Sequence, residues 1–133
     1  ILGIAAAVLG ARSVTAADVD EKAPEIVTAN AALNGVDGVF TVRVGDVIGD
    51  SRLRAKLGSG YDLVLANIVA DVIEPLAPYA PGFLAENGVF VCSGVIDGRE
   101  DGVAAALEAA GLHILRHDRM EEWNCFVCRR KNV

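Results

Sequence analysis

The feature that most constrains the fold of this chain is a short apolar run that ends in a single asparagine. Residues 63–66 are all aliphatic, a glycine-containing turn over residues 58–60 precedes them, and Asn67 follows. A strand that is apolar on both faces is what a parallel sheet covered by helices requires. Open sheets of this kind bind ligands just beyond the carboxyl ends of their strands. We therefore expect Asn67 to lie at a ligand site.

Strands and helices alternate along the rest of the chain. The sequence predicts helices over residues 1–9, 21–33, 51–57, 71–79 and 98–110, and strands over residues 13–17, 39–44, 63–66, 89–93, 112–117 and 123–129. This order predicts an α/β fold with a Rossmann-like, doubly wound and mostly parallel sheet. The last two strands have no helix between them, so we expect them to form an antiparallel hairpin.

Three local signals set expected boundaries. Asp20 is expected to cap the helix over residues 21–33, and Ser51 to cap the short basic helix over residues 51–57. The pair Asn87-Gly88 predicts a turn before the strand over residues 89–93. Pro75 and Pro78 predict that the helix over residues 71–79 is short or irregular.

The length of 133 residues corresponds to one domain, 1–133. A doubly wound domain is expected to open with a strand, whereas this chain opens with a predicted helix. We therefore expect a preceding strand that this sequence does not contain, so that the domain is truncated at its amino-terminal side.

Composition limits the classes of partner. The net charge of −6 argues against a nucleic-acid backbone as main partner, because binding phosphates takes an excess of lysine and arginine. An acidic surface suits a small cofactor or a basic protein substrate. No apolar run approaches the length of a membrane span. The three cysteines, without framework spacing, indicate a reducing compartment and hence the cytoplasm.

Cys125 and Cys128 have the spacing of a metal-binding pair, but the two residues fall on a predicted strand. Residues three apart on a strand point to opposite faces. The chain has no second cysteine pair to complete a site. We therefore expect no metal.

Several motifs occur in the order of a class I S-adenosylmethionine-dependent methyltransferase, namely residues 18–20, 44–46 and 62–67 and the closing hairpin. The segments 66–71, 93–96 and 122–123 more closely resemble the PrmA-type methyltransferases of ribosomal protein L-eleven. The resemblance covers essentially the whole chain but only the catalytic domain of that family. It implies a central strand and a glycine-rich loop, which would cradle the methionine part of the cofactor, immediately before Ile1.

The resemblance implies roles for residues at the first two predicted strand ends. Asp18 ends a strand where a carboxylate can bind both ribose hydroxyls of a nucleotide-type cofactor. By resemblance Val19 would face the adenine, Asp46 would accept a hydrogen bond from its amino group, and Val47 would lie beside the ring. The alternatives are solvated turn residues for Asp18 and Asp46, and strand packing for Val19.

Asn67 is the expected catalytic residue, and it is expected to contact the cofactor as well. An amide can accept a hydrogen bond from a neutral amine and orient its lone pair along the sulfur–methyl bond. The alternative is an asparagine that caps the following helix. Related enzymes that methylate nucleobases carry Asn-Pro-Pro-aromatic here, whereas residues 68–70 contain neither proline nor a ring, so a nucleobase substrate is disfavoured.

Ser93 and Gly94 end the next strand at the same edge of the sheet and are candidates for the substrate side, or else form a tight turn. The resemblance thus implies methyl transfer from S-adenosylmethionine to lysine or amino-terminal amines of a large-subunit ribosomal protein. The alternatives are an enzyme of the same fold for another protein or a small molecule, and a non-catalytic scaffold or relic domain.

Overall fold

The computed structural model describes residues 1–132 and divides into two compact units. The N-terminal unit comprises Ile1–Leu57, and the C-terminal unit comprises Gly58–Val133. No helix within residues 1–132 is long and apolar enough to cross a membrane.

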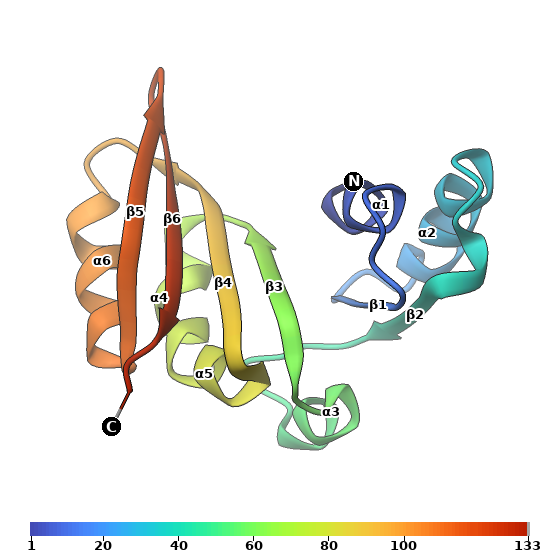
Figure 1. Cartoon of the computed structure of the whole chain (residues 1–133), viewed down its shortest axis with the longest axis horizontal. Coiled ribbons are helices and arrows are strands. Elements are labelled where there is room, and N and C mark those ends of the chain that lie inside the picture. Colours follow the sequence, from blue (N-terminus) through green and yellow to red (C-terminus); the bar gives the residue numbers. More distant parts are fainter. Residues whose placement is uncertain (133) are drawn as a thin grey trace. The chain divides into compact units, whose positions relative to one another are not determined.

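The N-terminal unit contains one pair of parallel strands with helices around it. Its elements are α1 (Leu2–Val8), β1 (Val14–Asp18), α2 (Ala23–Leu33), the 3-10 turn η1 (Asp37–Val39), β2 (Phe40–Val44) and α3 (Ser51–Leu57). β1 and β2 are the two strands of this unit (Figure 1). Their parallel register places Asp18 opposite Val44. The carboxyl ends of both strands therefore meet at one edge of this sheet.

Two predicted helix caps are wrong. α2 begins at Ala23 rather than residue 21, and Asp20 lies in the preceding turn, where its Oδ1 accepts a hydrogen bond from the Lys22 amide at 2.9 Å. Ser51 is the first residue of α3, and it is Asp50 whose carboxylate accepts from the amides of Arg52 and Leu53, at 2.8 and 3.2 Å. Aspartate and serine cap helices equally well, so residue type alone could not decide whether Asp50 or Ser51 caps α3.

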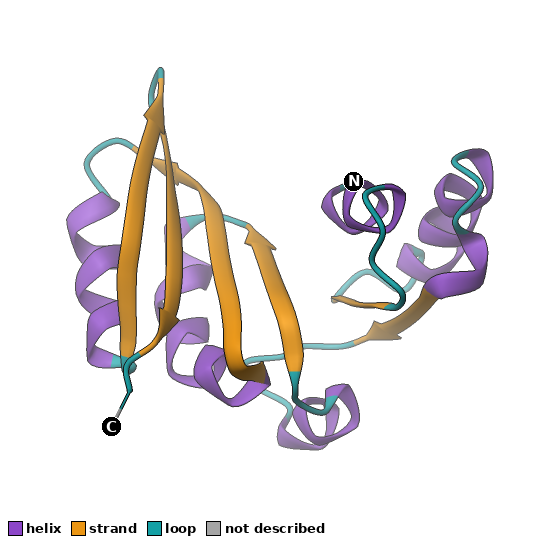
Figure 2. Ribbon diagram, viewed as in Figure 1, coloured by secondary structure: helices purple, strands orange, loops and turns teal. Residues whose placement is uncertain are grey.

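The C-terminal unit is a four-stranded sheet with helices on one face (Figure 1). Its elements are β3 (Tyr61–Asn67), α4 (Ala70–Leu76), η2 (Ala77–Tyr79), α5 (Ala80–Phe83), β4 (Leu84–Ile96), α6 (Glu100–Ala109), β5 (Leu112–Met120) and β6 (Trp123–Arg130). The strand order is β3-β4-β6-β5, with β3 and β4 parallel and the other pairs antiparallel. The predicted closing hairpin is thus confirmed (Figure 2). The predicted irregularity of the helix at Pro75 and Pro78 is also confirmed, because the 3-10 turn η2 follows α4 directly.

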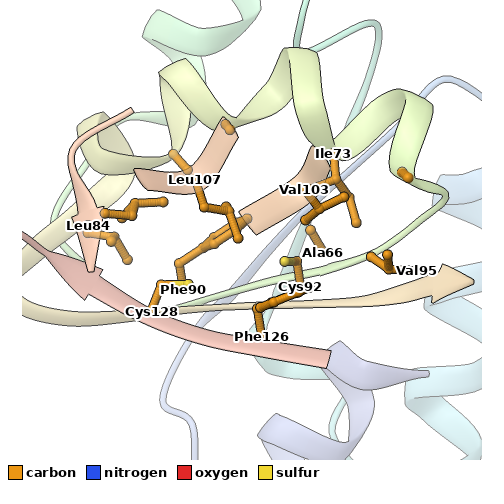
Figure 3. Packing of buried hydrophobic residues seen from close by; sticks show 14 residues of the cluster. Ala66, Ile73, Leu84, Phe90, Cys92, Val95, Val103, Leu107, Phe126 and Cys128 are labelled. Atoms are coloured by element: carbon orange, nitrogen blue, oxygen red, sulfur yellow. The ribbon is translucent and has the colours of Figure 1, made fainter. Parts of the chain in front are cut away.

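The core of the C-terminal unit lies between this sheet and the helices (Figure 3). Phe90 and Cys92 of β4 and Phe126 of β6 are buried on the sheet side, and they belong to one cluster with Ile73 of α4 and Leu107 of α6. These contacts follow from the alternation of strand side chains, which puts every second residue on the helix-covered face.

Two predictions about these strands need correction. The run 63–66 is buried on one face only: Ala66 belongs to the core cluster, whereas Leu63 is 45% exposed on the opposite face, because β3 is an edge strand whose helices lie on one side. β4 is also longer than predicted, and residues 87–88 lie inside it. The pairing with β3 shifts there, from Tyr61 opposite Leu84 to Leu63 opposite Val89, so the extra residues form an irregularity within the strand.

Candidate functional site

The first group of predicted site residues lies at the carboxyl edge of the β1–β2 pair. Asp18 is the last residue of β1, and its main-chain carbonyl accepts a hydrogen bond from the Gly45 amide at 2.8 Å, just beyond β2. This bond brings the turns after the two strands side by side. The structure thus places Asp18, Val19, Asp46 and Val47 together at one sheet edge.

Each carboxylate of this group uses one oxygen to shape its own turn. Asp18 Oδ1 accepts from the Asp20 amide at 3.0 Å, and Asp46 Oδ1 accepts from the Ile48 amide at 2.9 Å. The Oδ2 atoms of both accept no hydrogen bond from residues 1–132. Each aspartate therefore serves its turn and still offers an acceptor to a ligand.

The two valines provide apolar surface next to these acceptors. Val19 is 71% exposed, and Val47 is half-buried. α3 holds the loop at Val47, because Arg54 Nη1 donates to the carbonyls of Val47 and Ile48 at 2.7 and 2.6 Å. An exposed valine beside two carboxylates fits a planar apolar ring that carries polar groups at its edge.

The second group lies at the carboxyl edge of the β3–β4 pair in the C-terminal unit. Asn67 ends β3 opposite Ser93 of β4, and the amide after it, that of Ile68, donates to the Ser93 carbonyl at 3.2 Å. Asn67 is exposed, and its carboxamide makes no hydrogen bond with any residue from 1 to 132. Asn67, Ser93 and Gly94 therefore meet, as the sequence predicts for adjacent parallel strands.

Asn67 does not cap the next helix. α4 begins at Ala70, its N-cap is Val69, and no side chain bonds to its first turn. The capping alternative is thus wrong, and the carboxamide of Asn67 is left to bind something other than the helix.

An open pocket of about 500 Å³ lies next to Ser93 and Gly94. The hairpin of β5 and β6 supplies the rest of its lining, namely Asp118, Arg119, Met120, Trp123, Asn124 and Cys125. The predicted substrate-side residues are therefore part of a pocket, and Trp123, the tryptophan at the family-like Glu-Trp pair, belongs to the same pocket.

A polar cluster that the sequence did not predict lies around Asn124, one of the residues that line this pocket. Asn124 is 2% exposed, and its Nδ2 donates to the Val95 carbonyl at 3.2 Å and to Asp97 Oδ1 at 2.9 Å. Its Oδ1 therefore accepts, at 2.7 Å, from Nε2 of His117, whose ring stacks on Phe126. One signal was available: Asn124 shares its strand face with Phe126 and Cys128, so a polar side chain interrupts a buried apolar row.

Asp97 and Arg119 complete the cluster through a hydrogen-bonded ion pair. The hydrogen bonds from Asn124, which has the largest effect, and from Arg119 lower the pKa of the Asp97 carboxyl group. Asp97 is therefore ionised at neutral pH and can accept both hydrogen bonds. The cluster ties the end of β4 to the hairpin that forms the pocket.

The cysteines do not form a metal site of the C-x-x-C type. Cys128 is buried in the core cluster, whereas Cys125 is half-buried and lines the pocket on the other face. The two side chains point away from each other, as the strand geometry predicts. Burial raises the pKa of the Cys92 thiol to about 12 and that of Cys128 to about 11.

Comparisons with known proteins converge on one family. A family model described as "Ribosomal protein L11 methyltransferase (PrmA)" matches residues 1–131. Curated relatives of that name include one from Agathobacter rectalis, 42% identical over 92% of this chain and 39% of its own length, and one from Pelotomaculum thermopropionicum, 42% identical over 98% and 41%. This chain thus spans about two fifths of the length of these relatives.

Solved structures agree on the fold. A crystal structure of a ribosomal protein L11 methylase from Lactobacillus delbrueckii subsp. bulgaricus is 29% identical, with a TM-score of 0.86 over 98% of this chain and 64% of that chain. A putative methyltransferase complexed with SAH, 15% identical, has a TM-score of 0.75 over 94% of this chain and 41% of that one, and shows the fold alone. The predicted Rossmann-like class I fold is confirmed.

Proposed function

Since this chain belongs to the family of ribosomal protein L11 methyltransferases (PrmA), we propose that the protein carrying it transfers methyl groups from S-adenosylmethionine to amino groups of a ribosomal protein. The match to one family model over nearly all of the chain supports this proposal. It also supports treating the two compact units as parts of a single catalytic domain. The same match disfavours the scaffold and other-substrate alternatives.

The observation that carries the proposal is the exposed carboxamide of Asn67. This carboxamide stands at the carboxyl end of a strand, is exposed, and has no hydrogen-bond partner within residues 1–132. Methyl transfer to an amine is favoured by a neutral group that accepts one N–H and leaves the nitrogen lone pair aimed at the methyl carbon. The Asn67 amide oxygen does this without the negative charge that would keep the amine protonated.

The residues of the N-terminal unit fit the proposed cofactor. Asp18 Oδ2 would accept from the ribose hydroxyls, and Asp46 Oδ2 from the adenine amino group. Val19 and Val47 would contact the faces of the ring. When bound, S-adenosylmethionine supplies an electrophilic methyl group on a positively charged sulfur. These residues would bind and orient its ribose and adenine parts.

The proposed protein substrate is basic, and the chain's net charge of −6 supports this choice because opposite charge speeds encounter. The proposed target is the amine of a lysine side chain or of an amino terminus. We place the enzyme in the cytoplasm, where ribosomal proteins are available. The three free cysteines support a reducing compartment.

The test of this function is substitution of Asn67 in the protein expressed from its complete coding sequence. Asn67→Ala removes the orienting acceptor, and we expect kcat to fall roughly a hundredfold. The affinity for S-adenosylhomocysteine, measured by calorimetry, should fall far less than kcat, because the proposed contacts of Asp18 and Asp46 to the ribose and adenine remain. Asn67→Asp keeps the shape but adds a charge, so its activity should recover partly at higher pH, where the amine loses its proton.

The matched control is Asn87→Ala, which removes the same side chain from an exposed position in β4. It should methylate at the wild-type rate. A wild-type rate for Asn67→Ala, with ribosomal protein as substrate, would show that Asn67 does not act in the reaction.

A further inference from the structure

The end of β4 next to Asn67 contains a β-bulge. Cys92 pairs with Phe126 and Val95 pairs with Asn124, so two residues of β4, Ser93 and Gly94, lie opposite one residue of β6. Gly94 has a φ of +84°, a left-handed conformation that side chains disfavour. The bulge therefore redirects the backbone at the point where β4 passes the end of β3.

Gly94 leaves the space that the Asn67 side chain occupies. A Cβ atom at position 94 would lie 2.9 Å from Asn67 Oδ1 and 3.0 Å from the Ile68 carbonyl oxygen. Both distances are shorter than an ordinary van der Waals contact. The Ile68 carbonyl belongs to the backbone that the Ser93 carbonyl holds by a hydrogen bond, so this backbone is not free to retreat.

The bulge is also held from its other side. The carbonyl of Val95, the residue after Gly94, accepts from the buried Asn124, which is itself bonded to Asp97 and His117. Gly94 thus lies between a fixed polar cluster and the Asn67 carboxamide. A Cβ at position 94 would meet the Asn67 carboxamide and the Ile68 backbone. The Ile68 backbone is held by its hydrogen bond to Ser93, whereas the carboxamide has no hydrogen bond to residues 1–132, so the carboxamide would move.

We propose that Gly94 is a positioning residue, whose missing side chain sets the orientation of the Asn67 carboxamide for methyl transfer. This inference rests on the proposed catalytic role of Asn67. It gives Gly94 a role other than substrate contact: the residue acts through Asn67, and any larger residue at this position should reduce turnover more than cofactor binding.

The experiment compares Gly94→Ala with Gly111→Ala in the protein expressed from its complete coding sequence. Gly111 has a φ of +85°, so both substitutions force alanine into a left-handed φ, but a Cβ at Gly111 would lie within 4 Å of no atom of residues 1–132 other than its chain neighbours. We expect Gly94→Ala to lower kcat at least tenfold with an unchanged affinity for S-adenosylhomocysteine. Gly111→Ala should lose comparable thermal stability and keep its kcat.

Two further readouts separate positioning from general damage. In an Asn67→Ala background, Gly94→Ala should lower kcat by less than a further twofold, because the displaced group is already gone. The NMR signals of the Asn67 carboxamide, assigned by their loss in Asn67→Ala, should shift in Gly94→Ala and not in Gly111→Ala. Multiplicative losses of kcat, or unshifted carboxamide signals, would overturn the proposal.

The proposed roles of Gly94 and Asn67 can fail separately. If Asn67→Ala is inactive and Gly94→Ala keeps the wild-type kcat, the catalytic role of Asn67 stands and the positioning role of Gly94 is wrong. If Asn67→Ala itself keeps the wild-type kcat, the proposed function fails and the role of Gly94 fails with it.

Discussion

Asn124 links three parts of the C-terminal unit through one buried carboxamide. It contacts the end of β4 at Val95, the loop before α6 at Asp97 and the facing strand β5 at His117. A buried amide in an apolar row is costly unless its hydrogen bonds are made. Here both its donors and its acceptor are used, so the amide fixes the geometry of the strand ends.

We expect Asn124→Ala to lower the free energy of unfolding by about 1–3 kcal/mol, because the Val95 carbonyl then loses its buried donor. Chemical denaturation followed by circular dichroism measures this loss. Asn87→Ala, at an exposed position of the neighbouring strand, serves as the control and should lie within about 0.5 kcal/mol of wild type. Equal stability of the two variants would show that the cluster adds nothing to the fold.

Residues whose position follows from the end of a strand could be predicted from the sequence. Asp18, Asp46 and Asn67 each end a strand or follow one, so parallel pairing places them at sheet edges whatever the details of register. Asp97 and Arg119 could not be predicted to meet. Their contact depends on the register of the hairpin, which shifts between Ile114 and Arg116.

At the scale of the element, α3 provides a direct comparison between the predicted cap and the observed one. Asp50→Ala removes the carboxylate that accepts from two amides of the first turn, and it should lower stability by about 1 kcal/mol. Ser51→Ala removes the side chain that the sequence favoured and should be nearly neutral. Thermal unfolding of both variants measures the difference, and the reverse order would restore Ser51 as the cap.

The main helices and strands followed from apolar runs and from residues typical of helix ends, whereas the short helix α5 and the irregularities within β4 did not. Gly88 is an example: the Asn-Gly pair predicts a turn, but the residue lies inside the strand, where a Cβ would come within 2.6 Å of the Tyr61 carbonyl oxygen. That glycine permits a close approach between two strands. Sequence spacing cannot distinguish this use of glycine from a turn, because it depends on the partner strand.

At the scale of the whole molecule, the buried thiols link stability to alkaline pH. Burial raises the pKa of Cys92 to about 12 and that of Cys128 to about 11, from 9.0 in the unfolded chain. The folded state therefore holds these protons more tightly. Their contribution is complete below pH 9 and is lost as pH rises toward 11 and 12.

Above pH 9 we expect the free energy of unfolding to fall by about 1.4 kcal/mol per pH unit for each of these thiols. Denaturation under reducing conditions at pH 8, 9 and 10 measures the slope. Cys128→Ala removes one thiol and should reduce the slope by about that amount, because the other ionisable side chains are the same in both proteins. Identical slopes would mean that Cys128 ionises as readily when folded.

The pocket beside β4 has an optical consequence. Trp123 is the one tryptophan of this chain, it lines the pocket and it is 46% exposed. Excitation at the red edge of indole absorption therefore reports on this one location in the chain. A molecule that enters the pocket and displaces water from the indole should shift its emission to shorter wavelengths. The chain thus contains a built-in fluorescent reporter for whatever approaches Ser93 and Gly94.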